Sequence, residues 1–119
     1  MVNTILFPEG GWELSPEGKR EMMKVLPALQ GVSDKQIVIA GYTDNLRIEE
    51  PLARRFPNNW SLASARAISV VEFLEAQGLN PQQLSAVSFG KYHAIAPNDT
   101  PQGRSRNRRI SIAIQDQTP

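Results

Sequence analysis

The feature that most constrains the fold is a run of β-branched residues in the first half of the chain. Gln36–Thr43 reads QIVIAGYT, with Ile37, Val38 and Ile39 in succession. Neighbouring side chains of a strand point to opposite faces, so consecutive apolar residues are expected of a strand covered on both faces or nearly so. The run therefore predicts the central strand of a sheet.

Two segments on either side of this strand have the spacing of amphipathic helices, and a glycine follows each. The first is expected at about Pro16–Gln30, with Ser15 as its N-cap. The second covers Trp60–Gln77, with Asn59 or the neighbouring Asn58 as its cap. The residues expected to face the core are Met22, Met23, Val25, Leu26 and Leu29 of the first helix, and Ala63, Ala67, Val70, Val71, Leu74 and Gly78 of the second.

Three further segments are predicted as strands: Thr4–Phe7, Leu84–Phe89 and Arg109–Gln115. The intervening segment 91–106 is rich in Pro, Asn, Asp and Gly and is expected to be a loop. The order of elements is thus β-α-β-α-β-β, with crossover helices between the early strands and none before the last. This order indicates an α+β fold, a two-layer α/β sandwich with a mixed sheet.

Length and charge limit the classes of function. The chain has 119 residues, enough for one compact core, and its 13 basic and 12 acidic side chains nearly cancel. This balance gives no field that would make nucleic acid or anionic lipid the expected partner. Cysteine is absent, and no apolar run is long enough to span a bilayer. Residues 1–119 are expected to form a single domain, excised from a longer membrane-anchored protein.

Two charged residues stand out in this background. Asp44 directly follows the central strand, at the edge where open sheets with crossover helices often bind ligands. Asn59 and Arg66 are seven residues apart, which places them about 20° apart on one flank of the second helix. Both can therefore border a groove that holds Asp44. A separated acid and base suit a zwitterionic ligand such as an amino-acid end group.

Each of these residues also has a structural interpretation. Asp44 can form an Asx turn or cap the residues that follow it. Arg66 can be a solvated helix residue or can pair with Asp44 itself. The segment 45–58 between them is predicted to be an exposed loop, with room for one short helical turn. After Asn45 it reads LRIEEPLARRFPN.

Enzymatic chemistry is not indicated. The serines lack a GxSxG context, His93 lies in a predicted loop without a recognisable partner, and Glu49 and Glu50 are adjacent acids of a proline-bounded loop. We expect no catalytic residue, no metal site and no cofactor. The basic cluster GRSRNRR, residues 103–109, permits weak nucleic-acid binding, but it has no interleaved aromatic residues. The favoured interpretation is that its arginines brace the loop before the last strand.

Taken in order, the motifs GYTDN, FPNNWSLASARA, VVEFL, LSAVSFGKYHAIAPNDT and GRSRNRRISI resemble the OmpA-like (OmpA/MotB C-terminal) peptidoglycan-binding domain. The similarity extends from ILF near the start to ISIAI near the end. The gap between Asp44 and Asn59 resembles the longer loop of MotB-type flagellar stator proteins. The resemblance implies a mixed four-stranded sheet with helices on one side.

This resemblance also implies a function. Such a domain binds the diaminopimelate of the peptidoglycan stem peptide without catalysis, Asp44 taking the ammonium and Arg66 the carboxylate. Thr43 and Asn59 would support the pocket, and Phe7, Leu62 and Arg108 would form its wall and rim. The resemblance further implies a periplasmic domain of a bacterial cell-envelope protein, tethered to the inner membrane by a missing N-terminal segment if it is MotB-like.

Three functions are left open at this stage. The first is a wall anchor, either a MotB-like stator component, for which a homodimer is expected, or a generic OmpA/Pal-type envelope tether. The second is a protein-interaction module in which the 45–58 loop docks a partner and Asp44 pairs internally with Arg66. The third is weak nucleic-acid binding through residues 103–109.

Overall fold

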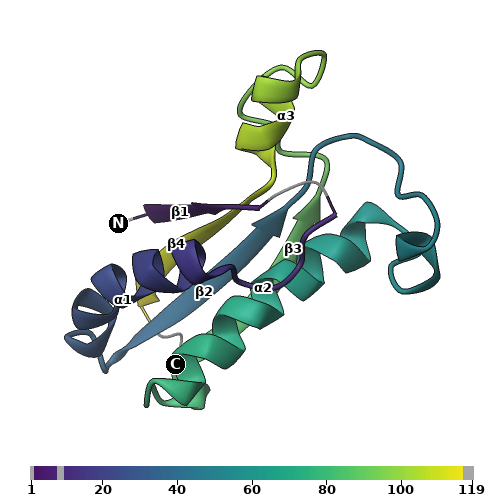
Figure 1. Cartoon of the computed structure of the whole chain (residues 1–119). Helices are drawn as coiled ribbons and strands as arrows, with labels where there is room; N and C mark the ends of the chain where they lie inside the picture. Colours follow the sequence, from purple (N-terminus) through teal and green to yellow (C-terminus); the bar gives the residue numbers. More distant parts are fainter. Residues whose placement is uncertain (1, 8–9, 117–119) are drawn as a thin grey trace.

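A computed structural model describes residues 2–7 and 10–116 of the chain, and four strands and three α-helices lie within this part (Figure 1). In chain order the elements are β1 (Val2–Leu6), α1 (Pro16–Gln30), β2 (Lys35–Tyr42), the 3₁₀ turn η1 (Leu52–Arg54), α2 (Asn59–Ala76), the 3₁₀ turn η2 (Pro81–Gln83), β3 (Leu84–Gly90), α3 (Pro101–Asn107) and β4 (Arg109–Asp116).

The strands form one mixed sheet in the order β1-β4-β2-β3. β2 runs parallel to β3 and antiparallel to β4, and β4 is antiparallel to β1. A parallel pair needs a crossover connection, and α2 supplies it between β2 and β3. The predicted mixed α+β fold and the central place of β2 are both confirmed.

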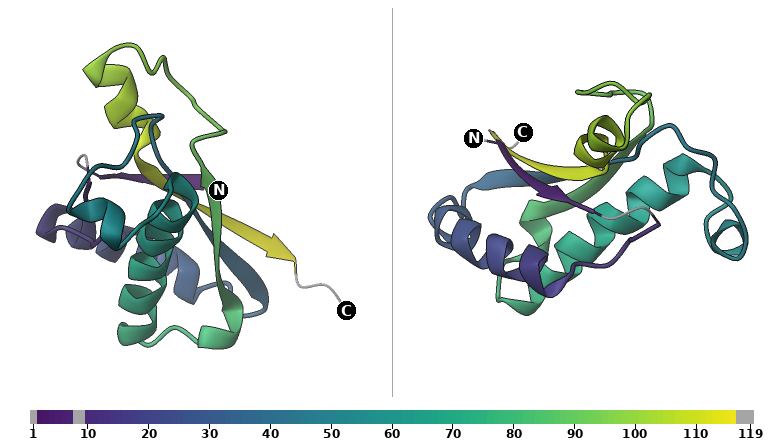
Figure 2. Two further views of the ribbon diagram at one scale, coloured as in Figure 1. Left: turned by 90° about the vertical axis from the view of Figure 1, so that its right-hand side faces the viewer. Right: turned by 45° about the horizontal axis from the view of Figure 1, so that its top comes forward.

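Both long helices lie on one face of the sheet (Figure 2). Ile37 and Ile39 of β2 point to that face and are fully buried, together with their cross-strand neighbour Ile112 of β4. Val38 points to the opposite face and is only half-buried. The prediction that β2 is covered on both faces or nearly so is therefore wrong, because the helices protect one face only.

The cores of α1 and α2 follow the predicted spacing with a few exceptions. Met22, Leu26 and Leu29 of α1 are buried, as are Ala63, Ala67, Val70 and Leu74 of α2. Met23 is 47% exposed, Gly78 is exposed, and Val25 and Val71 are half-buried. The N-caps are Ser15, which accepts from the Gly18 amide, and Asn58, which accepts from the Ser61 amide. Capping thus starts both helices within one residue of the expected position.

The segment expected to be a loop from 91 to 106 contains the helix α3. Thr100 caps it by accepting a hydrogen bond from the Gly103 amide, and Pro101 occupies the first turn. Gly103 lies so close to residue 97 that a Cβ would come within 1.8 Å of the Pro97 carbonyl oxygen. The helix is short and has no apolar repeat, so hydrophobic spacing gave no signal for it.

Candidate functional site

Asp44 lies just past the end of β2 and is buried together with Thr43. Its Oδ1 atom accepts a hydrogen bond from the Leu46 amide at 3.0 Å, which is an Asx turn. The Thr43 hydroxyl donates to the Asp44 carbonyl oxygen at 2.8 Å. The turn interpretation is therefore correct, and it leaves the other carboxylate oxygen directed at a second group.

That second group is Arg108, at the C-terminal end of α3. Its Nη1 atom donates to Oδ2 of Asp44 at 2.7 Å, and its Nε atom donates to the Phe7 carbonyl oxygen at 3.0 Å. The two paired side chains are 13% and 7% exposed. Such a pair is screened little by salt. Arg108 was expected at the rim of the site, yet it forms the ion pair of Asp44.

Arg66 of α2 has no exposed surface, so it belongs to the core side of the helix and not to its flank. Its Nε atom donates to the Gly11 carbonyl oxygen at 2.7 Å, and its Nη1 atom donates to the Tyr42 carbonyl oxygen at 3.0 Å. The guanidinium also lies 5.3 Å from the centre of the Phe7 ring. These contacts join α2 to the end of β2 and to the segment that precedes α1.

Burial lowers the pKa of Arg66 to about 10; the negative charge of Asp44 opposes this shift, and the positive charge of Arg108 adds to it. Arg66 therefore remains cationic at neutral pH. Counting all the charged side chains that line it, the site holds two carboxylates, of Asp44 and Glu49, and three guanidinium groups, of Arg47, Arg66 and Arg108. Its local charge is positive, although the whole chain is almost neutral.

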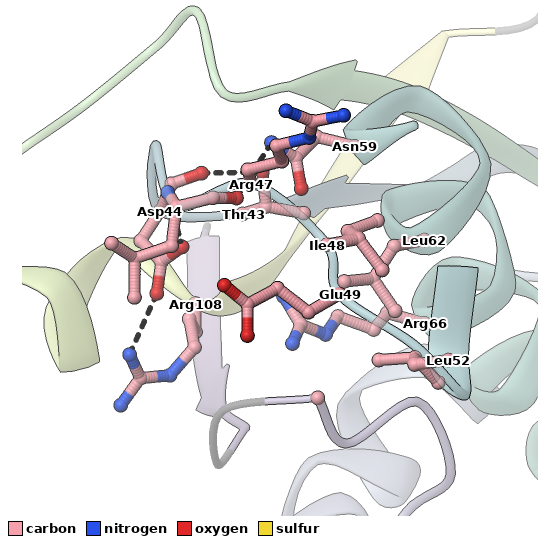
Figure 3. A pocket seen from close by; sticks show the side chains of 12 residues that line it. Thr43, Asp44, Arg47, Ile48, Glu49, Leu52, Asn59, Leu62, Arg66 and Arg108 are labelled. Carbon is pink, nitrogen blue, oxygen red and sulfur yellow. Dashed lines mark hydrogen bonds and ion pairs between the residues drawn. The ribbon is translucent and has the colours of Figure 1, made fainter. Parts of the chain in front are cut away.

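A cleft of about 580 Å³ opens over these groups (Figure 3). The loop 45–58 forms one wall, and the first two turns of α2 form another. In Figure 3 the Glu49 side chain extends across the cleft, in front of Arg66. The lining residues are Gly10, Thr43, Asp44, Leu46, Arg47, Ile48, Glu49, Leu52, Asn59, Leu62, Arg66 and Arg108.

Comparison with known proteins identifies the family of the chain. Residues 6–108 match the OmpA family. The chain belongs to the OmpA family. Peptidoglycan-binding protein ArfA of Mycobacterium tuberculosis is 33% identical over 110 residues, which make up 92% of this chain and 32% of that protein. Motility protein B of Bacillus subtilis is 37% identical over 81 residues, 67% of this chain and 30% of the relative. The chain thus spans about a third of the length of these relatives.

Solved structures of similar shape come from two kinds of assembly. The C-terminal domain of Helicobacter pylori MotB has a TM-score of 0.89 and 26% identity, covering 98% of this chain and 87% of its own. The cell wall anchor of the T6SS from Pseudomonas aeruginosa has a TM-score of 0.83 and 29% identity, covering 98% and 81%. The expected OmpA/MotB-like architecture is therefore confirmed.

In this OmpA-family domain, six of the seven residues expected at the site line one cleft: Thr43, Asp44, Asn59, Leu62, Arg66 and Arg108. The seventh, Phe7, is buried behind Arg66 and does not line it. Asn59 donates to the Leu46 carbonyl oxygen at 3.3 Å, which ties the loop to α2. The cleft thus combines residues from four separate parts of the chain.

The contribution of the loop 45–58 to the cleft was not predicted from the sequence. Arg47, Ile48, Glu49 and Leu52 line the cleft, although no binding role was predicted for any of them. The arginines of the basic cluster mostly brace the structure, as predicted: Arg104 donates to the Asn98 carbonyl oxygen and Arg109 to that of His93. Loop side chains have no periodicity, so a pattern search cannot assign them to a cleft.

The described part of the chain places no three His, Cys, Asp or Glu side chains where they could hold a metal ion together. Within residues 2–7 and 10–116, no helix has the length and apolar character needed to cross a membrane. The charged side chains that line the cleft are those of Asp44, Arg47, Glu49, Arg66 and Arg108, and each can form ion pairs and hydrogen bonds with a ligand.

Proposed function

We propose that this domain binds peptidoglycan without catalysis and anchors a larger envelope protein to the cell wall. The observation that carries the proposal is the buried Asp44–Arg108 ion pair beside Arg66, at the base of a cleft of about 580 Å³. The family supports it, because one relative is named a peptidoglycan-binding protein and one structural neighbour is a cell wall anchor.

The ligand that fits these charges is the amino-carboxyl end of diaminopimelate in the stem peptide. An ionised carboxylate has about four acceptor positions, and the protein contacts described above use two on Asp44. An ammonium group can take the others. The ligand carboxylate pairs with Arg66, with the positive field of Arg108 beside it. Each such charged hydrogen bond contributes about 1.5–3 kcal/mol.

Access to Arg66 requires a small movement of the loop. Arg66 has no exposed surface, and Glu49 and Leu52 of the loop line the same cleft. Glu49 is exposed and has a long side chain, so it can change rotamer at little cost. The ligand carboxylate then replaces that of Glu49 in front of Arg66. The charge of Asp44 is already balanced by Arg108, so the affinity of each site for the ligand is modest. A tether that binds one polymer through several such sites needs no higher affinity per site.

Within this function we assign the chain to the MotB-like group, as the periplasmic, homodimeric part of a stator component anchored in the inner membrane. Two of the relatives reported above are MotB proteins, one with a TM-score of 0.89. A second assignment, a generic envelope tether, has support from the wall anchor of a secretion system with a TM-score of 0.83. Both assignments place the same cleft against the wall.

The test is co-sedimentation with purified cell-wall sacculi. Asp44→Ala and Arg66→Ala are expected to lose binding by roughly tenfold to a hundredfold each, while circular dichroism shows that the fold is kept. Free meso-diaminopimelate should compete, and lysine, which lacks the second carboxylate, should compete poorly. Asp99→Ala, which removes an exposed acid that does not line the cleft, is the control. Wall binding by both cleft variants at the level of the wild type would reject this site.

A further inference from the structure

Two aromatic side chains, Trp60 and Tyr92, lie exposed beside the cleft; we name them the aromatic shelf. They are 49% and 63% exposed, and their ring centres are 5.4 Å apart with an interplanar angle of 32°. Trp60 lies in the first turn of α2, and Tyr92 follows β3. Large aromatic faces left in contact with water at one place often mark a binding surface.

The shelf is held in position before any ligand arrives. Gly90 has a φ of +58°, and a Cβ at this position would lie 3.3 Å from atoms of the Trp60 indole, which therefore rests on the glycine. The Ser88 hydroxyl donates to the Trp60 carbonyl oxygen at 2.8 Å. On the other side, the Lys91 ammonium lies 5.6 Å from the centre of the Tyr92 ring. Little conformational entropy is lost when a ligand stacks on rings that are already fixed.

A groove of about 450 Å³ runs along the shelf and continues into the main cleft. Arg47, Ile48 and Asn59 line both the groove and the cleft. In Figure 3, Arg47 and Asn59 lie next to each other at one end of the cleft. The groove therefore extends the proposed peptide site instead of forming a separate one.

Several of the polar groups along the groove are hydrogen-bond donors. Lys91, Arg47 and Asn58 line it. Oδ1 of Asn58 accepts from the Ser61 amide, and its Nδ2 atom has no hydrogen-bond partner among the described residues. Flat aromatic faces flanked by such donors are complementary to a pyranose ring, which presents both apolar C–H groups and hydrogen-bond acceptors. The carbon-bound hydrogens of the sugar face the rings, and its hydroxyl and acetamido oxygens accept hydrogen bonds.

We propose that the aromatic shelf binds the glycan strand of the wall, by stacking of an N-acetylated hexopyranose on Trp60 and Tyr92. This inference rests on the proposed function, because a stem peptide held in the cleft is covalently joined to the sugar beside it. That connection raises the local concentration of sugar at the shelf, and weak stacking then adds to the affinity for the polymer. Nucleotide bases also stack on aromatic rings, but no covalent connection brings them to this groove.

The experiment uses three probes, and the first two are applied to the double variant Trp60→Ala/Tyr92→Ala. Binding to intact sacculi should fall roughly three- to tenfold, the effect expected of one lost stacking contact. Binding of a soluble stem peptide that carries diaminopimelate but no sugar should be unchanged. Chitotetraose, an N-acetylated glycan without peptide, should change the fluorescence of Trp60 in a Trp12→Phe background, which leaves a single tryptophan. Ile68→Ala, an equally exposed apolar truncation on α2, is the control.

The outcomes separate this inference from the proposed function. Asp44→Ala should lose the soluble peptide and still respond to chitotetraose. If Asp44→Ala binds sacculi fully while the shelf variant does not, the peptide site is wrong and the shelf is right. Four results would each overturn the glycan assignment. Two concern the shelf variant: binding of sacculi at the wild-type level, or a loss of soluble-peptide binding equal to its loss of sacculus binding. The other two are no fluorescence response to chitotetraose, and displacement of chitotetraose by a single-stranded oligonucleotide.

Discussion

Arg108 joins Asp44 to the backbone of the segment that follows β1. One guanidinium contacts a carboxylate 64 residues earlier in the chain and a carbonyl oxygen 101 residues earlier. Because both paired side chains are largely buried, loss of either one leaves the other without compensation in a region of low dielectric. The pair therefore stabilises the fold, and under the proposed function it also takes part in ligand binding.

The variant Arg108→Gln tests this double role. We expect the free energy of unfolding to fall by about 1–3 kcal/mol, because the carboxylate of Asp44 loses its ionic partner. Affinity for a diaminopimelate peptide should also fall, since the positive field beside the ligand carboxylate is weaker. Chemical denaturation and isothermal titration calorimetry measure the two quantities. Arg106→Gln is the matched control, because Arg106 is exposed on the same helix; equal effects of the two variants would contradict the assigned role.

Sequence reasoning at this scale could find the charges but not their partners. Asp44 was found from its place after a strand, and Arg66 from its place on a helix. Arg108 and Arg109 are adjacent, and strand alternation says only that their side chains point to opposite faces. Which of them contacts Asp44 depends on the path of α3, and no local pattern encodes that path.

Among the elements, α3 and the segment before it depend on one fully buried amide, Asn107. Its Oδ1 atom accepts from the amides of Ile95 and Ala96, and its Nδ2 atom donates to the Ala96 carbonyl oxygen and to Oδ1 of Asn98. All four hydrogen bonds are between 2.8 and 3.1 Å. They hold the segment 95–98 against α3 directly beside Arg108.

We therefore expect Asn107→Ala to lower the free energy of unfolding by about 1–3 kcal/mol and to increase the mobility of segment 91–100. The peptide affinity of the cleft should fall as well, because Arg108 is the next residue. Urea denaturation measures the stability, and hydrogen exchange at residues 95 and 96 measures the mobility. Gln102→Ala, an exposed change in α3, serves as the control. Unchanged exchange at both amides in the Asn107 variant would show that the segment is held by other contacts.

The elements differ in how far the sequence could define them. Apolar spacing and caps defined α1 and α2 to within a residue, because both signals repeat or occur at known positions. The helix α3 lacks the repeat, and only the dipeptide Thr100-Pro101, a cap followed by a first-turn proline, marked its start. The loop 45–58 was recognised as a loop, yet the inward direction of Glu49 follows from contacts made only after folding.

For the whole molecule, the sheet order brings distant segments to one edge. β4 lies between β1 and β2, so the residues before β4 meet the end of β2 and the segment after β1. Periodicity predicted the elements and the mixed sheet, but strand order depends on long-range pairing. Helix spacing placed Arg66 beside Asp44, and the family resemblance supplied what local patterns could not: that Arg108 belongs to the same site.

The distance between the two layers at this edge depends on Gly41 of β2. A Cβ there would lie 2.0 Å from the Ala63 carbonyl oxygen of α2, so the helix packs against bare strand backbone. Asp44 comes three residues after Gly41, and Arg66 three residues after Ala63. The contact thus sets how far apart the acid and the base of the cleft stand.

Gly41→Ala should push α2 away from β2, at a cost of about 1–3 kcal/mol in the free energy of unfolding. It should also weaken binding of the diaminopimelate peptide, because a wider cleft cannot contact both ends of a short zwitterion. Gly31→Ala is the matched control, since a Cβ there meets its nearest neighbour at 3.6 Å, an ordinary contact distance. Denaturation midpoints and calorimetric affinities give both results. If Gly41→Ala keeps the wild-type affinity despite lower stability, the spacing of the layers does not determine recognition, and the loop 45–58 must position the ligand instead.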